Sequence, residues 1–151
     1  VPEEVLSLAR NNIVVHESDL PRGRGWSPLT WQVLEGRSQL TLSLFEATSQ
    51  VDSGMIYIQD ILKFDGTELI DELRSKTGRA KVSMCLQFVE QYPDIVQSGS
   101  PQTGPATYYP RRTISDSKLD AFLAESFDIK EPFNQYILKF LNISWYCRQR
   151  G

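Results

Sequence analysis

Apolar and polar positions follow one another along the chain in patterns that predict short helices and strands. Residues 2–9 combine an early proline, two acidic residues and spaced aliphatic residues, which is typical of a short helix. The β-branched run 13–15 predicts a buried strand. Leucines alternate with smaller polar residues over 40–45, and 55–64 is again rich in β-formers, so both stretches predict strands.

Helical repeats and helix-boundary residues mark the connections and the second half. Ser27-Pro28 is a helix start signal for residues 29–35, because proline is pre-organised for a first turn. A further helix is expected to start at Thr67 and to break near Thr77-Gly78. A second helix then follows to about Gln91, with apolar residues along one face. Strands and helices in this order predict an α/β domain.

The last third of the chain is less regular. Residues 97–105 are rich in Gly, Pro and Ser and predict an exposed loop. Residues 107–112 are expected to be extended, and 116–122 to form a short helix. The segment 131–147 is apolar and aromatic, so we expect it to pack on this chain or on a partner.

The composition is that of an ordinary globular domain and narrows the chemistry. The chain has 151 residues, 40% hydrophobic content, a net charge of −3 and a pI near 5.2. This acidic balance argues against a nucleic-acid partner, which usually leaves a basic surface. Cys85 and Cys147 lie far apart beside a single histidine, so we expect no metal site. No apolar run is long enough to span a bilayer, so a cytoplasmic protein is expected.

His16 is the only histidine, and it stands where the predicted strand 13–15 opens into a Gly- and Pro-rich loop. Ligands of α/β proteins bind outside the carboxyl ends of strands, which makes this a candidate reactive position. The competing interpretation is a structural, hydrogen-bonded histidine. Ser18 shares one side of a strand with His16, but that spacing alone does not define a nucleophile pair. Pattern alone therefore leaves an α/β domain with a candidate site at His16.

Two motifs sharpen this picture. Residues 16–28 read His-Glu-Ser-Asp-Leu-Pro-Arg-Gly-Arg-Gly-Trp-Ser-Pro, and a helix with Trp31 is predicted to follow. This stretch resembles the formyltransferase family, whose members typically carry His-x-Ser-Leu-Leu-Pro, then a glycine, a proline and a helix. A second family element, an Asp-(Thr/Ser)-Gly loop between two strands, stands here as Val51-Asp52-Ser53-Gly54. His16 and Asp52 lie 36 residues apart, the separation that the family shows between its catalytic His and Asp.

The resemblance covers roughly residues 2–112, and the wording of 23–28 and 108–112 looks closest to the branch that formylates nucleotide-linked amino sugars. It implies a Rossmann-type partial domain with a mostly parallel sheet flanked by helices. Residues 1–112 would be the C-terminal portion of the catalytic core, and 113–151 a divergent C-terminal extension. It also implies a small-molecule acceptor and 10-formyltetrahydrofolate as the formyl donor.

The family resemblance also implies roles for particular residues. His16 would stabilise the formyl oxygen as it becomes an oxyanion, the electrostatic term that is usually largest in acyl transfer. Asp52 would orient His16 and accept a proton from the attacking amine. The backbone of Ser49, Gln50 and Val51 would meet the pterin edge. Taken by itself, Asp52 also fits an Asx-turn residue in an exposed loop.

Two departures from the family pattern keep a second hypothesis open. The family usually has an Asn two residues before the histidine, where this chain has Val14, and Asn12 lies one pleat too far back to replace it. Only a short segment precedes His16, where the family places a first Rossmann-like half, and the chain begins at Val1, so two interpretations stay open: an excerpt of a longer enzyme and a truncated family member. The first hypothesis is an N-formyltransferase acting on a nucleotide-linked amino sugar. The second is a catalytically impaired, truncated formyltransferase-fold protein that works by binding or dimerising.

We also expect a homo-oligomer. A parallel sheet that lacks its first strands would expose an edge and an apolar face. Self-association through residues 131–147 is therefore predicted.

Overall fold

The structure is a computed structural model that describes residues 1–64, 68 and 70–111. Its elements in chain order are α1 (Glu3–Leu6), β1 (Ile13–His16), β2 (Arg24–Gly25), α2 (Pro28–Leu34), β3 (Gln39–Glu46), β4 (Ile56–Lys63), α3 (Ile70–Glu90), α4 (Asp94–Gln97) and β5 (Tyr108–Tyr109). The predicted strands and the predicted helix 29–35 are present, whereas α1 is shorter than predicted. The expected starting residue Thr67, the predicted helix 116–122 and the segment 131–147 lie outside the described residues.

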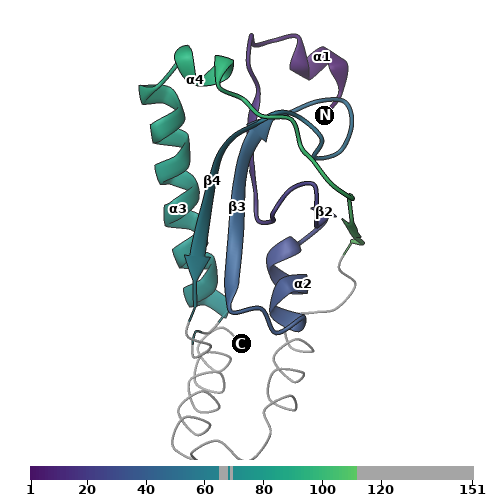
Figure 1. Ribbon diagram of the computed structural model, residues 1–151, viewed down its shortest axis with the longest axis vertical. Helices are drawn as coiled ribbons and strands as arrows, with labels where there is room; N and C mark the ends of the chain where they lie inside the picture. The colour runs from purple at the N-terminus through teal and green to yellow at the C-terminus, as the bar shows by residue number, and fades with distance from the viewer. Residues whose placement is uncertain (65–67, 69, 112–151) are drawn as a thin grey trace, which may run out of the picture.

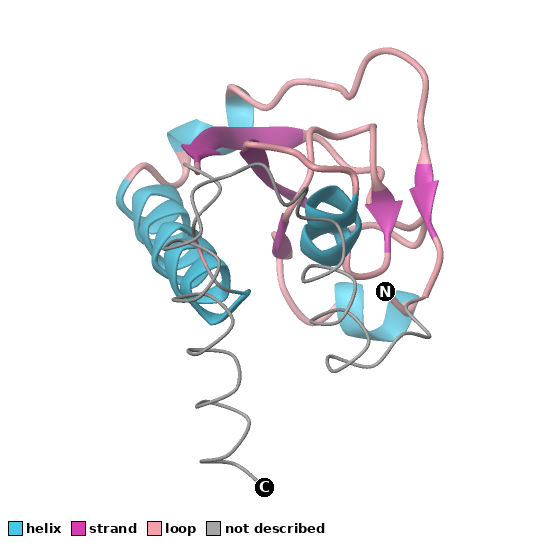
Figure 2. Ribbon diagram, turned by 90° about the horizontal axis from the view of Figure 1, so that it is seen from below, coloured by secondary structure: helices cyan, strands magenta, loops and turns pink. Residues whose placement is uncertain are grey.

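The strands form a central sheet with helices around it. The sheet has the order β1-β3-β4, and β2 and β5 form a separate two-stranded pair. Figures 1 and 2 show α3 toward one flank of the molecule and α2, β2 and β5 toward the other, while Leu29 of α2 belongs to the same buried cluster as residues of α3. The predicted α/β class is thereby confirmed.

Strand direction differs from the mostly parallel sheet that was predicted. β1 pairs antiparallel with β3, and β3 pairs antiparallel with β4; among the strands of the described residues, only β2 and β5 run parallel. The β3–β4 connection, residues 47–55, contains no helix. A parallel pair needs a crossover of about a dozen or more residues, so this short loop returns the chain antiparallel and places Asp52 at its turn.

The core lies between the sheet and α3. Leu40, Leu42 and Leu44 of β3 are at most 2% exposed. They belong to one cluster with residues of α2, α3 and α4, namely Leu29, Leu73, Met84, Phe88 and Ile95. Burying one such side chain contributes about 1.5–3 kcal/mol, so this cluster anchors the sheet that carries the site.

α3 runs without interruption from Ile70 to Glu90, so the predicted break near Thr77-Gly78 is wrong. Thr77 is 1% exposed, and its hydroxyl donates a hydrogen bond within the helix to the carbonyl oxygen of Arg74 at 3.1 Å. Gly78 costs a helix only about 1 kcal/mol relative to alanine. The buried residues on either side therefore outweigh this local preference.

Glu46, at the end of β3, ties the N-terminal segment to β4. Its carboxylate accepts hydrogen bonds from the Tyr57 hydroxyl at 2.7 Å, the Asn12 backbone N–H at 2.6 Å and the Asn11 side-chain amide at 3.1 Å. Burial raises the pKa of Tyr57 to about 12, and the adjacent Glu46 carboxylate adds to the shift. Burial and the neighbouring Glu35 likewise raise the pKa of Tyr109 to about 12.

These two tyrosines predict a loss of stability at high pH. Their folded-state pKa lies above the unfolded value of 10, so their contribution is complete below pH 10 and is lost as the pH rises toward 12. We expect the double variant Tyr57→Phe/Tyr109→Phe to show a smaller fall in the free energy of unfolding over that range. Urea denaturation at several pH values measures this. Tyr108→Phe, which removes an exposed tyrosine, is the control, and an unchanged slope in the double variant would contradict the expectation.

Candidate active site

His16 is the last residue of β1 and is only 8% exposed. Its Nε2 lies 2.8 Å from the carbonyl oxygen of Gly23. Because a carbonyl oxygen only accepts, this hydrogen bond requires a proton on Nε2. The predicted strand-end position is confirmed, and the ring is fixed in a tautomer that offers an N–H donor.

Asp52 comes to the same place from the loop between β3 and β4. Its Oδ2 lies 3.7 Å from His16 Nε2 and accepts a hydrogen bond from the backbone N–H of Gly25 at 2.8 Å. The two residues singled out by their spacing are thus brought together in space. The carboxylate bonds to a residue 27 positions away, so the hydrogen bonds among the described residues do not support the Asx-turn interpretation.

The conformation of the Asp52 loop is tightly constrained. Asp52 has a φ of +48°, in the left-handed region that a non-glycine residue occupies only when its surroundings hold it there. At Gly54 an added Cβ would overlap the carbonyl oxygen of Glu46, so only glycine fits. The backbone N–H of Glu46 donates to the Met55 carbonyl at 2.9 Å and closes the loop.

Gln102 is a site residue that the sequence did not reveal. Its Nε2 donates to the carbonyl oxygens of Asp52 and Gly54, both at 2.9 Å. Its Oε1 accepts from Arg24, at 3.2 Å from Nε and 2.6 Å from Nη2. Residues 97–105 were predicted only as an exposed loop, because a glutamine among Gly, Pro and Ser carries no signal of its partners.

The glycine-rich loop after β1 is held by the segment before Arg111. β2 pairs in parallel with β5, and the backbone N–H of Gly23 donates to the Thr107 hydroxyl at 2.8 Å. Gly25 has a φ of +100°, and a Cβ there would lie 2.5 Å from the Tyr109 carbonyl oxygen. Gly25 is therefore needed for β5 to approach, and its N–H then points to Asp52.

The remaining predicted residues have different surroundings. Ser49 and Gln50 are exposed, and Val51 is 59% exposed, all on the loop that bears Asp52. Ser18 is 2% exposed, and its hydroxyl has no hydrogen-bond partner among the described residues. Since His16 Nε2 is engaged by Gly23 rather than by Ser18, the structure supports no Ser–His nucleophile pair.

Neither Val14 on β1 nor Asn12 just before it supplies an amide donor to the site. Val14 is 36% exposed and paired with Phe45 of β3. The side-chain amide of Asn12 donates to the carbonyl oxygen of Leu6 at 2.9 Å, which ties down the end of α1. Asn12 is thus occupied elsewhere, in agreement with the expectation that it does not replace the family Asn.

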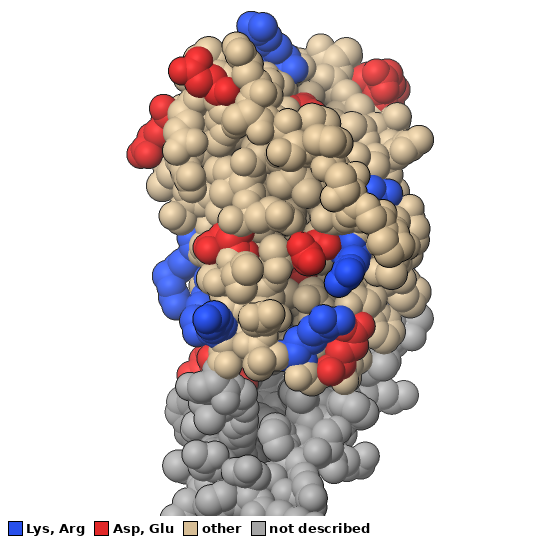
Figure 3. All heavy atoms as spheres, in the orientation of Figure 1, with Lys and Arg blue, Asp and Glu red and all other residues tan. Residues whose placement is uncertain are grey.

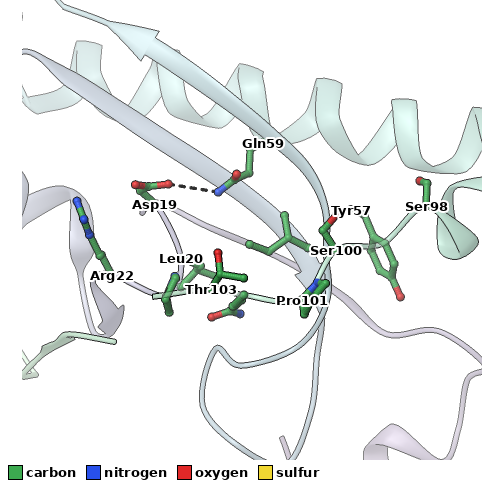
Figure 4. Close-up of a pocket in the computed structure, with 12 residues that line it drawn as sticks. Asp19, Leu20, Arg22, Tyr57, Gln59, Ser98, Ser100, Pro101 and Thr103 are labelled. Carbon is green, nitrogen blue, oxygen red and sulfur yellow. Dashed lines mark hydrogen bonds between the residues drawn. The ribbon is translucent and has the colours of Figure 1, made fainter. Parts of the chain in front are cut away.

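A pocket of about 490 Å³ lies beside this site rather than in it (Figure 4). It is lined largely by polar side chains, among them Asp19, Arg22, Gln59 and Gln102. Neither His16 nor Asp52 lines it, so the pocket does not open directly on the pair. Gln102 connects the two regions, because it lines the pocket and also bonds the backbone of Asp52.

The described residues contain neither a cluster of metal ligands nor a membrane-spanning helix. Within residues 1–64, 68 and 70–111, no group of three or more His, Cys, Asp or Glu residues is placed to hold a metal ion. In the same part of the chain, no helix has the length and hydropathy needed to cross a bilayer. On the face shown in Figure 3, basic and acidic residues are interspersed.

Known proteins with similar sequences are formyltransferases, although no protein-family model matches the chain. The methionyl-tRNA formyltransferase of Leifsonia xyli subsp. xyli is 30% identical over 125 residues, which is 80% of this chain and 40% of that protein. The chain spans between 32% and 43% of the length of the curated relatives compared.

Solved structures show the same fold. Methionyl-tRNA formyltransferase from Clostridium thermocellum is 27% identical with a TM-score of 0.55, and the match covers 90% of this chain and 55% of that one. The formyltransferase PseJ from Anoxybacillus kamchatkensis, in complex with a UDP-linked formamido sugar and tetrahydrofolate, is 22% identical with a TM-score of 0.56. That match covers 92% of this chain and 69% of the other.

Proposed function

Because this chain matches the formyltransferase family in sequence and in fold, we propose that it is an N-formyltransferase. Its donor is 10-formyltetrahydrofolate, and its acceptor is the amine of a nucleotide-linked amino sugar. One observation carries the proposal: His16 Nε2 and Asp52 Oδ2 lie 3.7 Å apart at the carboxyl end of a strand. This is the pair of residues that acyl transfer to an amine requires, an oxyanion donor beside a base.

The loop that bears Asp52 fits the folate. Ser49 and Gln50 are exposed, and the backbone groups of Ser49 and Val51 take part in none of the hydrogen bonds found among the described residues. Such free N–H and C=O groups suit the donors and acceptors of a pterin edge, and the exposed Val51 side chain suits its ring. When bound, 10-formyltetrahydrofolate supplies the formyl group.

The residues of the pair divide the work of the reaction. N-formylation adds the formyl group to the acceptor nitrogen and removes one proton from it. As negative charge develops on the formyl oxygen, the Nε2–H of His16 turns to it from the Gly23 carbonyl oxygen, its acceptor in the structure, and donates there. The Asp52 carboxylate stabilises the ring and accepts the proton of the amine, directly or through a water molecule.

Two lines of support favour a sugar nucleotide as the acceptor. The residues Gly-Arg-Gly-Trp-Ser-Pro at 23–28 resemble the sugar-modifying branch. Structural neighbours include WlaRD, a sugar 3N-formyl transferase seen with dTDP and 5-N-formyl-tetrahydrofolate. Methionyl-tRNA, which the names of the curated relatives give, is the competing acceptor, and the mixed charge of the face in Figure 3 and the pI of 5.2 argue against it.

A non-catalytic role is the second candidate, and two observations favour it. Val14 provides no amide where the family usually has one, and loss of an oxyanion donor commonly costs about 10²–10³-fold in rate. The Gly23 carbonyl also occupies His16 Nε2. In this role the protein binds folate or a partner without turnover. The edge of β1 away from β3 has no strand partner among the described residues, and self-association through 131–147 stays a prediction.

Calorimetric titration with a stable reduced-folate analogue separates these candidates, followed by a formyl-transfer assay with 10-formyltetrahydrofolate and UDP- or dTDP-linked amino sugars. Binding with transfer supports the enzyme, whereas binding without transfer to any acceptor supports the non-catalytic role. Absence of folate binding would contradict the proposed donor. A tRNA acceptor in the same assay tests the competing substrate.

Gln102 offers a separate test of the site. We expect Gln102→Ala to lower kcat about tenfold with a smaller change in KM, because Asp52 loses the support that keeps it beside His16. Steady-state kinetics measure both constants. Gln97→Ala is the matched control, since Gln97 is exposed at the end of α4. Equal kcat in the two variants would show that the Gln102 hydrogen bonds do not position Asp52.

A further inference from the structure

Four large side chains lie along the paired strands β2 and β5, and we call them the β2–β5 strip: Arg24, Trp26, Tyr108 and Arg111. Figure 1 shows β2 and β5 near each other, away from α3, and Arg24 is paired with Tyr108 in register. Trp26 directly follows β2 and its backbone N–H donates to the Tyr109 carbonyl at 3.1 Å. Arg24 and Trp26 flank Gly25, so one residue separates their side chains along the chain.

The aromatic members of the strip are exposed. Trp26 is 59% and Tyr108 is 63% exposed. Trp31 differs, since its ring stacks on Tyr109 with centroids 6.2 Å apart and its indole N–H donates to the Pro110 carbonyl at 3.0 Å. Trp31 and Tyr109 therefore hold the loop to β5, and packing does not account for Trp26. Its indole is an exposed platform of the kind on which a nucleobase stacks.

The arginine members of the strip carry charge that no carboxylate of the described residues neutralises. Among the described residues, neither Arg24 nor Arg111 forms an ion pair with an acidic side chain. Arg24 bonds only neutral groups, Gln102 and the Tyr108 hydroxyl, and these use three of its five N–H donors. The guanidinium of Arg111 lies 5.4 Å from the centroid of the Trp26 ring. Two unpaired guanidinium groups beside an exposed indole suit an anion joined to a planar ring.

The strip also adjoins the candidate catalytic pair. Gly25, the residue between Arg24 and Trp26, is the one whose N–H bonds the Asp52 carboxylate at 2.8 Å. A ligand that contacts both Arg24 and Trp26 therefore binds on both sides, along the chain, of the residue whose N–H bonds Asp52. A sugar attached to the phosphate end of such a ligand would be carried toward His16 and Asp52.

We propose that the β2–β5 strip binds the nucleoside diphosphate part of the acceptor, with the base on Trp26 and the diphosphate between Arg24 and Arg111. The inference rests on the proposed function for the identity of the linked sugar, but nucleotide binding itself is measurable without turnover. A pyrimidine or purine base stacks on the open face of the indole, while Arg111 covers the other. An RNA footprint would require a wider basic surface than two arginines supply.

The test is calorimetric titration of the full chain with UDP and dTDP, and with uridine for comparison. We expect UDP or dTDP to bind more tightly than uridine, with an affinity that falls as salt is raised. Trp26→Ala should weaken nucleotide binding about tenfold or more, and Trp26→Phe should recover most of it. Arg111→Gln should weaken binding of the diphosphates about fivefold or more and leave uridine nearly unchanged. Arg79→Gln removes an exposed arginine from α3 and should have no effect.

Several outcomes would overturn the inference. The first is that neither UDP nor dTDP binds. The second is that Trp26→Ala and Arg111→Gln leave the affinity for the diphosphates unchanged. The third is that a short RNA ending in CCA binds more tightly than the diphosphates and that the same two variants weaken this binding. Failure of the proposed function is separate. If nucleotide binding depends on the strip but no formyl group is transferred to any amino sugar, the nucleotide site is supported and the proposed formyltransferase activity is contradicted. If formyl transfer to a sugar nucleotide occurs and both variants leave it unchanged, the proposed activity is supported and the nucleotide site on the strip is contradicted.

Discussion

Replacing His16 with alanine is expected to lower the rate of formyl transfer by about 10²–10³-fold. The reason is that, in the proposed mechanism, the Nε2–H leaves the Gly23 carbonyl to donate to the developing oxyanion, and removing one such donor commonly costs this much. Since the ring stabilises the transition state more than the ground state, kcat should fall while KM changes little. Single-turnover assays with saturating donor measure the chemical step directly.

Asp52→Asn is the companion variant for the same pair. It keeps an oxygen to accept from Gly25 N–H but removes the charge beside His16 and the base for the amine proton. Transfer should fall by about 10²-fold or more, with the thermal midpoint of unfolding close to that of the unaltered chain. Turnover near the normal rate in either variant, with the fold intact by circular dichroism, would refute the assignment of the pair.

Gly54→Ala is expected to cause a large loss in the free energy of unfolding. The new Cβ would overlap the Glu46 carbonyl oxygen, which belongs to the backbone of the central strand and cannot rotate away. Relief requires the Asp52 loop to move off β3. We expect a loss of about 3 kcal/mol or more in the free energy of unfolding, measured by urea denaturation.

Gly78→Ala is the matched control, because it adds the same methyl group inside α3, where no atom lies within 4 Å of the new Cβ. It should stabilise the helix by about 0.5–1 kcal/mol. Equal effects of the two substitutions would mean that the loop accommodates a side chain at 54. Formyl transfer by any folded Gly54→Ala protein should also be reduced, since Asp52 would leave its position beside His16.

Local sequence signals recovered the elements whose causes are local. The alternation over residues 40–45 gave β3, and Pro28 with Gly36 bounded α2, where Gly36 has the expected φ of +70°. Strand direction was not recoverable in the same way, because alternation is identical in parallel and antiparallel strands. The predicted break at Thr77-Gly78 failed since buried contacts along α3 exceed the local cost of these residues.

By itself, the sequence determined the α/β class, the positions of β1, β3 and β4, and the candidate pair His16 and Asp52. The class and the strands follow from residue periodicity, and the pair follows from two sequence motifs separated by the spacing that is typical of the family. Only the tertiary structure decided what holds the pair together. The Gly25 N–H bonds the Asp52 carboxylate across a sequence separation of 27 positions, and Gln102 bonds the Asp52 backbone across a separation of 50. No local pattern encodes such contacts, because they exist only once β5 has paired with β2 and brought both loops to one place.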